Sequence, residues 1–112
     1  MGTDNRRYPR VEVNWPITMI TSTGTIDAMA KNVSLEGVFV RCPEVSDLED
    51  TFRLIIKPPE GQIFLATGRK VWSDTFSRDE RTFHGIGVSF LYIVDDDRHV
   101  LSELITEQLE SE

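Results

Sequence analysis

The sequence is short of the features that mark secreted and membrane proteins. Its one cysteine, Cys42, cannot form a disulfide within the chain, which fits a reducing compartment. No apolar run approaches the roughly 18 residues that a membrane-spanning helix requires, and the N-terminal sequence MGTDNRRYPR lacks the apolar core of a secretory signal peptide. We therefore expect a soluble, cytoplasmic protein that does not insert into a membrane.

Positive charge is also scarce. The chain has 12 Lys and Arg against 19 Asp and Glu, a net charge of −7. Because nucleic-acid affinity rests largely on basic residues that release counterions, this balance argues against a general DNA or RNA binder. The basic residues are unevenly spread, however, since Arg6, Arg7 and Arg10 crowd the N-terminus while acidic residues crowd the other end. A local anion site is compatible with this distribution.

Motifs for catalysis and metal binding are missing as well. The sequence contains no C-x-x-C, H-E-x-x-H or G-x-S-x-G pattern around Cys42, His84 or His99. The consecutive acidic residues 95–97 precede an expected helix, where carboxylates more often complement the helix dipole than hold a cation. We expect no catalytic residue, no metal and no cofactor. A small hydrolase or nuclease would have only scattered acidic residues to support it.

What the sequence does contain is a series of short strands. With 112 residues and 39% hydrophobic content, the chain has room for one domain with one core. Apolar and polar residues alternate with a period of two between turn signals, with an edge or bulge expected at Pro16 and a bend at Gly68. The predicted strands are residues 11–18, 26–31, 37–41, 52–57, 62–72 and 83–91, with a short connection at 32–36 and a polar loop at 73–81.

From Asp95 onward the apolar residues change to helical spacing, at Leu101, Leu104, Ile105 and Leu109. The sequence therefore predicts a mainly β fold, a small antiparallel six-stranded barrel with a C-terminal α-helix on its outside or across one mouth. Residues 1–10 have no hydrophobic period and are predicted to form a flexible basic arm. Residues 11–112 are predicted to form the barrel and helix as a single domain.

Two short motifs carry side chains suited to binding an anion. Arg6 and Arg10 form an R-x-x-x-R pair, and their planar guanidinium groups can grip a phosphate or the O6 and N7 edge of guanine. Asn32, Ser34 and Gly37 form an N-x-S-x-x-G pattern. In an extended segment the amide and the hydroxyl project from the same face, and a glycine lets a ligand or the chain itself approach closely. Singly, the motifs have structural explanations: a solvated tail, an Asx-type turn and a bulge glycine.

Together and in this order, the two motifs resemble the signature of the PilZ family. In that family R-x-x-x-R near the start of the domain is followed by (D/N)-x-S-x-x-G at the entry to an apolar strand. The segments GRKVW at residues 68–72 and GIGVSF at residues 85–90 resemble the family's later strands, so the likeness covers nearly the whole chain. Asn32 stands where many members have Asp, and Glu36 occupies a slot that is often a second glycine.

The resemblance implies a receptor for cyclic di-GMP that signals through protein contacts without catalysis. The arm would fold onto the barrel around the nucleotide, and the changed surface would be read by an unidentified protein partner or by another copy of the chain, which would be a monomer or a homodimer. The alternative is a PilZ-fold adaptor that binds no nucleotide and acts only by protein contacts, as in pilus or flagellar control. The implied ligand-binding residues are Arg6, Arg7, Arg10, Asn32, Ser34 and Gly37.

Overall fold

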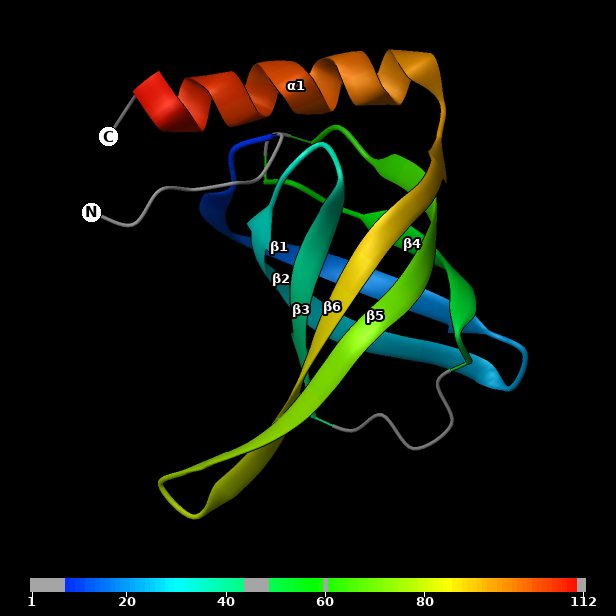
Figure 1. Cartoon of the computed structure of the whole chain (residues 1–112), viewed down its shortest axis with the longest axis vertical. Helices are drawn as coiled ribbons and strands as arrows, with labels where there is room; N and C mark the ends of the chain where they lie inside the picture. The colour runs from blue at the N-terminus through cyan, green and yellow to red at the C-terminus, as the bar shows by residue number, and fades with distance from the viewer. Residues whose placement is uncertain (1–7, 44–48, 60, 111–112) are drawn as a thin grey trace.

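The chain folds into six strands followed by one helix. The computed structural model describes residues 8–43, 49–59 and 61–110. Its elements are β1 (Val11–Thr21), β2 (Gly24–Val33), β3 (Gly37–Cys42), β4 (Thr51–Ile56), β5 (Phe64–Arg78), β6 (Arg81–Ile93) and α1 (Asp95–Glu110) (Figure 1).

The strands form a closed barrel in the order β1-β2-β3-β6-β5-β4, and every neighbouring pair is antiparallel. Closure pairs β1 with β4, so within the barrel wall no strand is left with a free edge. The predicted six-stranded antiparallel barrel with a C-terminal helix is therefore confirmed.

The core follows from the alternation of side chains along each strand. In β4, Phe52, Leu54 and Ile56 are buried, whereas the alternating Thr51 and Arg53 are exposed. Successive side chains of a strand point to opposite faces, so the inward set of each strand fills the barrel. The bend predicted at Gly68 coincides with a register shift between residues 67 and 68. The shift in β1 lies between residues 12 and 15, just before Pro16, which itself pairs in register with Met29.

Cys42 belongs to this core. Its side chain is buried at the end of β3, and burial raises the pKa of the thiol to about 11. At neutral pH the group therefore stays protonated and packs as a small apolar side chain, because the thiolate is the reactive form.

Helix α1 runs across one end of the barrel (Figure 1). Its buried residues are Leu101 and Ile105, which join the barrel core, while Leu109 near its end is exposed. Three acidic residues occupy its first turn, where their negative charge interacts favourably with the helix dipole. Among the described residues, no helix is both long and apolar enough to cross a membrane.

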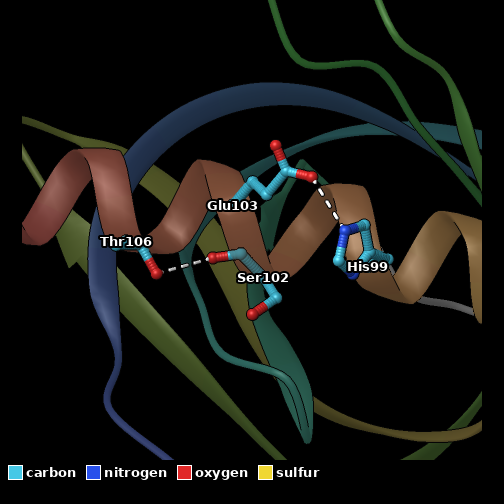
Figure 2. Close-up of polar contacts among 4 residues, drawn as sticks. All are labelled: His99, Ser102, Glu103 and Thr106. Atoms are coloured by element: carbon cyan, nitrogen blue, oxygen red, sulfur yellow. Dashed lines mark hydrogen bonds and ion pairs between the residues drawn. The ribbon is translucent and has the colours of Figure 1, made fainter.

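The outward side of α1 carries contacts between neighbouring turns, which Figure 2 shows. His99 Nε2 lies 3.1 Å from Glu103 Oε1, and Thr106 Oγ1 donates a hydrogen bond of 3.0 Å to the Ser102 carbonyl. Both contacts join residues four apart in sequence, which share one helix face. They lie within the helix and do not attach it to the barrel. That attachment comes from the buried Leu101 and Ile105 and from the hydrogen bonds that Asp97 and Arg98 make with the backbone of residues 65 and 35.

The prediction of a loop at residues 73–81 is wrong. β5 and β6 stay paired from Ser73↔Ile86 to Arg78↔Arg81. From Phe76↔Phe83 onward they continue as a two-stranded ribbon, beyond Cys42↔His84, where the pairing of β3 with β6 ends. The ribbon projects from the barrel end opposite α1 (Figure 1). Its turn residues, 79 and 80, have φ of 53° and 63°, as a two-residue type I′ hairpin turn requires. The residues of β5 from 71 to 78 are exposed, so no hydrophobic period marked the strand.

The connection predicted at residues 32–36 is shorter than expected. Asn32 and Val33 belong to β2, where they pair with Phe39 and Val38 of β3. Only residues 34–36 lie between the two strands. The two polar residues of the motif therefore lie in different structures: Asn32 is on a paired strand, and Ser34 begins a tight loop.

Candidate functional site

A pocket of about 180 Å³ opens on the outer face of the barrel, where β2, β3, β6 and β5 lie side by side. Four predicted site residues line it together: Arg10, Asn32, Ser34 and Gly37. The other two, Arg6 and Arg7, lie outside the described residues. The remaining lining residues are Glu36, Val38, Phe39, Val71, Trp72, Gly87, Val88 and Ser89.

The 34–36 loop is held by its own hydrogen bonds. The Ser34 amide donates to the Gly37 carbonyl (2.9 Å), and the Glu36 amide donates to Ser34 Oγ (3.0 Å). The Phe90 amide of β6 donates to the Glu36 carbonyl (2.7 Å), which fixes the loop to the barrel. Ser34 is only 5% exposed, and its hydroxyl oxygen accepts in this turn, while no described residue accepts the hydroxyl proton.

Gly37 has a structural reason to be a glycine. It pairs with Ser89 of β6, and a Cβ placed on it would lie 2.1 Å from the Val88 carbonyl oxygen, a contact that backbone cannot tolerate. The sequence left open whether a ligand or the chain itself approaches this position. In the structure, the chain does.

Aromatic rings form one wall of the pocket. Trp72 of β5 stacks on Phe39 of β3, with ring centroids 5.3 Å apart and an interplanar angle of 20°. The indole lies against the backbone of Gly87, where a Cβ would come within 2.1 Å of Trp72 Nε1. Trp72 is 45% exposed, so part of its ring system is open to a planar ligand.

Trp72 was not among the residues predicted to bind ligand. Its signal in the sequence is the pair Gly85 and Gly87, which alternate on β6 and leave space beneath aromatic rings of a neighbouring strand. That space is used, because Phe76 covers Gly85 as the indole covers Gly87. The strand register that brings these residues together could not be read from the sequence.

Arg98 of α1 joins the pocket loop to the start of the described chain, and sequence reasoning missed it. Its Nη1 donates to the Leu35 carbonyl (3.2 Å), and its guanidinium carbon lies 5.6 Å from the Tyr8 ring centroid. The helix, the 34–36 loop and the segment leading to Arg10 therefore meet at one side chain.

The charges at the pocket have both signs. Arg10 is exposed and contributes a guanidinium group, whereas Glu36, also exposed, contributes a carboxylate. Asp97, from the acidic run 95–97, accepts a hydrogen bond from the Leu65 amide (3.3 Å). In residues 8–43, 49–59 and 61–110, no group of three or more His, Cys, Asp or Glu is arranged to hold a metal ion. The pocket thus offers an arginine, an amide, a hydroxyl and an aromatic face, which suit a ligand with a phosphate and a planar base.

Comparison with known proteins identifies the family. The model of the PilZ domain matches residues 4–107. A search of curated proteins returns no match. Several solved structures share the fold at low identity: the PilZ domain of Escherichia coli YcgR with c-di-GMP (TM-score 0.76, 14% identity, 96% of this chain and 94% of that chain) and the Bacillus subtilis inhibitor of motility MotI/DgrA (0.82, 16%, 98% and 53%).

A further structure, K. pneumonia MrkH in its apo state, has a TM-score of 0.83 at 14% identity, over 99% of this chain and 53% of that one. The chain thus spans about half the length of MotI/DgrA and of MrkH. The family model covers nearly the whole sequence, and the closed barrel with its helix matches a solved PilZ domain over almost its full length. This chain therefore belongs to the PilZ domain family.

Proposed function

We propose that this chain is a receptor for cyclic di-GMP. The observation that carries the proposal is the pocket where Arg10 comes together with the motif residues Asn32, Ser34 and Gly37, which lie more than 20 positions later in the chain, beside an exposed tryptophan. The PilZ domain of E. coli YcgR and the PlzA protein of Borreliella burgdorferi were both solved with c-di-GMP, which supports the same ligand here.

Each side chain has a role that follows from its chemistry. The guanidinium group of Arg10, together with Arg6 and Arg7, would grip phosphate oxygens or a guanine edge, since this planar fork binds both bidentately. Asn32 can donate and accept at a base edge, and the free proton of the Ser34 hydroxyl can be donated to an acceptor on the ligand. Trp72 provides a surface for stacking a base.

The size of the pocket supports a closing arm. Its volume of about 180 Å³ is below the roughly 300–1,000 Å³ of pockets that enclose a small molecule. A nucleotide with two guanine bases and two phosphates would therefore be only partly held by the barrel face. In the proposed mechanism the arginine segment, residues 1–10, folds over the exposed part, and this ordering changes the surface that a protein partner reads. No chemical step is involved.

One observation favours the alternative of an adaptor without nucleotide. The Glu36 carboxylate lines the pocket and is exposed, so it would repel a phosphate brought near it. Neutralising this side chain should therefore strengthen binding if the pocket is the nucleotide site, whereas an adaptor would remain unable to bind.

Calorimetric titration of the purified chain with cyclic di-GMP tests the proposal. We expect saturable binding, with a stoichiometry that distinguishes one nucleotide from a stacked pair. Glu36→Gln should bind more tightly than the parent, while Arg53→Ala, a change at an exposed residue of β4 outside the pocket, should bind as the parent does. If neither the parent nor Glu36→Gln takes up nucleotide, the receptor function is wrong and the adaptor function stands.

A further inference from the structure

A second pocket of about 440 Å³ lies between β2, the end of β3 and the start of β6. We call it the hairpin groove, defined by Met29, Lys31, Arg41, Arg81 and Phe83, because the projecting β5–β6 ribbon forms one wall. It shares no lining residue with the first pocket. The proposed nucleotide site therefore leaves this groove unexplained.

The groove is locally basic on an acidic protein. Lys31, Arg41 and Arg81 line it, and no described acidic residue does, although the chain's net charge is −7. Across the ranges 8–43, 49–59 and 61–110, none of these three cations is within ion-pair distance of a carboxylate. Lys31 Nζ donates to Asn14 Oδ1, a neutral partner that leaves the ammonium charge uncompensated. Such a site is electrostatically complementary to carboxylates.

Aromatic packing prepares one of these cations for a ligand. The Arg41 guanidinium lies over the Phe83 ring, 3.9 Å from its centroid. Stacking uses the face of the guanidinium and leaves its in-plane N–H groups able to donate to a carboxylate. Phe83 in turn faces Phe76 across the ribbon, with centroids 6.1 Å apart. The arginine is therefore held in place before any partner arrives.

The groove also offers apolar surface and free backbone. Met29 is 37% exposed and lines the groove together with Phe83, so an apolar side chain of a ligand has a surface against which it can be buried. Pairing of β3 with β6 ends at Cys42↔His84, and no described strand pairs with residues 81–83 on that side. Unpaired backbone groups at a strand edge accept an extended peptide as an added strand.

We propose that the hairpin groove binds a short, extended acidic segment of a partner protein, with carboxylates on Arg41, Arg81 and Lys31 and an apolar anchor against Phe83. This inference rests on the proposed function in one respect: it takes the groove as the surface through which the proposed receptor contacts its protein partner. A long polyanion such as a DNA strand fits less well, because the neighbouring pocket that shares Arg41, Arg81 and Phe83 is also lined by the acidic Asp79.

Fluorescence anisotropy on the full chain tests the proposal. The probes are fluorescein-labelled peptides of alternating Glu with one Phe placed at different positions, the same peptides with Gln for Glu, and a labelled oligo-dT strand. We expect at least one acidic peptide to bind, with affinity that falls as salt rises, and the Gln peptides and oligo-dT to bind at least tenfold more weakly.

Charge-reversal variants locate the site. Arg41→Glu and Arg81→Glu should each lower peptide affinity tenfold or more, and Phe83→Ala should lower it several-fold. Arg53→Glu, the same charge change on an exposed strand residue outside the groove, should have less than a twofold effect. Circular dichroism checks that each variant is folded, and Arg41→Lys, which keeps the charge, provides a milder variant should a reversal unfold the chain.

The proposal is overturned if no acidic peptide binds, if Arg53→Glu weakens binding as much as Arg41→Glu, or if oligo-dT binds as tightly as the peptides. Titration of the same preparations with cyclic di-GMP is scored separately. Peptide binding without nucleotide binding would refute the receptor function and leave the groove assignment intact, and the reverse result would refute the groove assignment alone.

Discussion

Gly37 combines a place in a binding motif with a place in the barrel wall. It lines the candidate pocket, yet the atom that excludes a side chain there is the backbone oxygen of Val88. Asn32 and Ser34 differ from it, because their polar groups can serve a ligand without being required for strand pairing. Single residues of one motif thus have separable structural and binding roles, and substitution of Gly37 tests this separation.

Gly37→Ala should destabilise the free protein. The added methyl group forces β3 and β6 apart at their first pair, and overpacking of this kind costs about 1–3 kcal/mol, enough to lower the melting temperature by several degrees. Thermal denaturation without ligand measures the effect, and Ser89→Ala, which removes an atom from the opposite residue, serves as the control. Unchanged melting combined with lost nucleotide binding would instead assign Gly37 to the ligand.

Arg10→Ala should weaken cyclic di-GMP binding and leave melting nearly unchanged, because Arg10 is exposed at the pocket rim. Loss of a charge-assisted contact costs about 1.5–3 kcal/mol, roughly ten- to hundredfold in affinity. We expect the same of Arg6→Ala and a smaller loss for Arg7→Ala. Calorimetry measures the affinity and thermal denaturation measures the melting temperature. If Arg10→Ala and Arg6→Ala both bind cyclic di-GMP with parental affinity, these arginines do not grip the ligand as proposed.

At the scale of elements, the N-terminal segment and the barrel are proposed to respond differently to ligand. Arg98 holds the Leu35 carbonyl and lies near the Tyr8 ring, so the pocket loop, helix α1 and the segment that precedes β1 are already in contact. The barrel strands, by contrast, are closed by ladders on both sides. A ligand that recruits the segment should therefore act locally.

Hydrogen exchange measures this response. On addition of cyclic di-GMP, backbone amides of residues 3–10 should gain protection while those of the barrel strands change little. GMP at the same concentration is the control, since it lacks the second phosphate and base. Protection that is absent from residues 3–10, or that spreads evenly over the barrel, would contradict ordering of the segment as the switch.

The elements that the sequence predicted correctly are those with one buried face. The apolar strand 37–41 and the helix starting at Asp95 each show their period because water is excluded from one side only. The β5–β6 ribbon was missed because solvent reaches it at both faces, so its strands keep no apolar period. Trp72 and Arg98 were missed for a different reason, since their places in the site depend on strand register and on helix docking rather than on neighbouring sequence.

At the scale of the whole molecule, charge is distributed unevenly. The protein measures 36 × 34 × 25 Å, several times the screening length of about 10 Å at 0.1 M salt. Most of the net charge of −7 is therefore screened from any one site, and a ligand responds to the charges beside it. At the candidate pocket the described charged neighbours are Arg10 and Glu36.

Affinity for cyclic di-GMP should consequently fall as salt rises from about 50 mM to about 500 mM, because attraction to the arginines dominates at short range. The salt dependence should be weaker in Arg10→Ala, which removes one of the attracting charges. Calorimetric titrations at several NaCl concentrations give both slopes. If the affinity does not change with ionic strength, or if its salt dependence is equal in the parent and in Arg10→Ala, electrostatic attraction by the arginines does not drive binding.

The separation of the two pockets has an evolutionary consequence. Because they share no lining residue, a substitution at Arg41 or Arg81 removes no atom from the wall of the pocket that contains Asn32 and Ser34. Selection can therefore change the surface offered to a partner while the surface offered to a nucleotide stays as it is. After duplication of such a gene, the copies can acquire different protein partners and still bind the same small molecule.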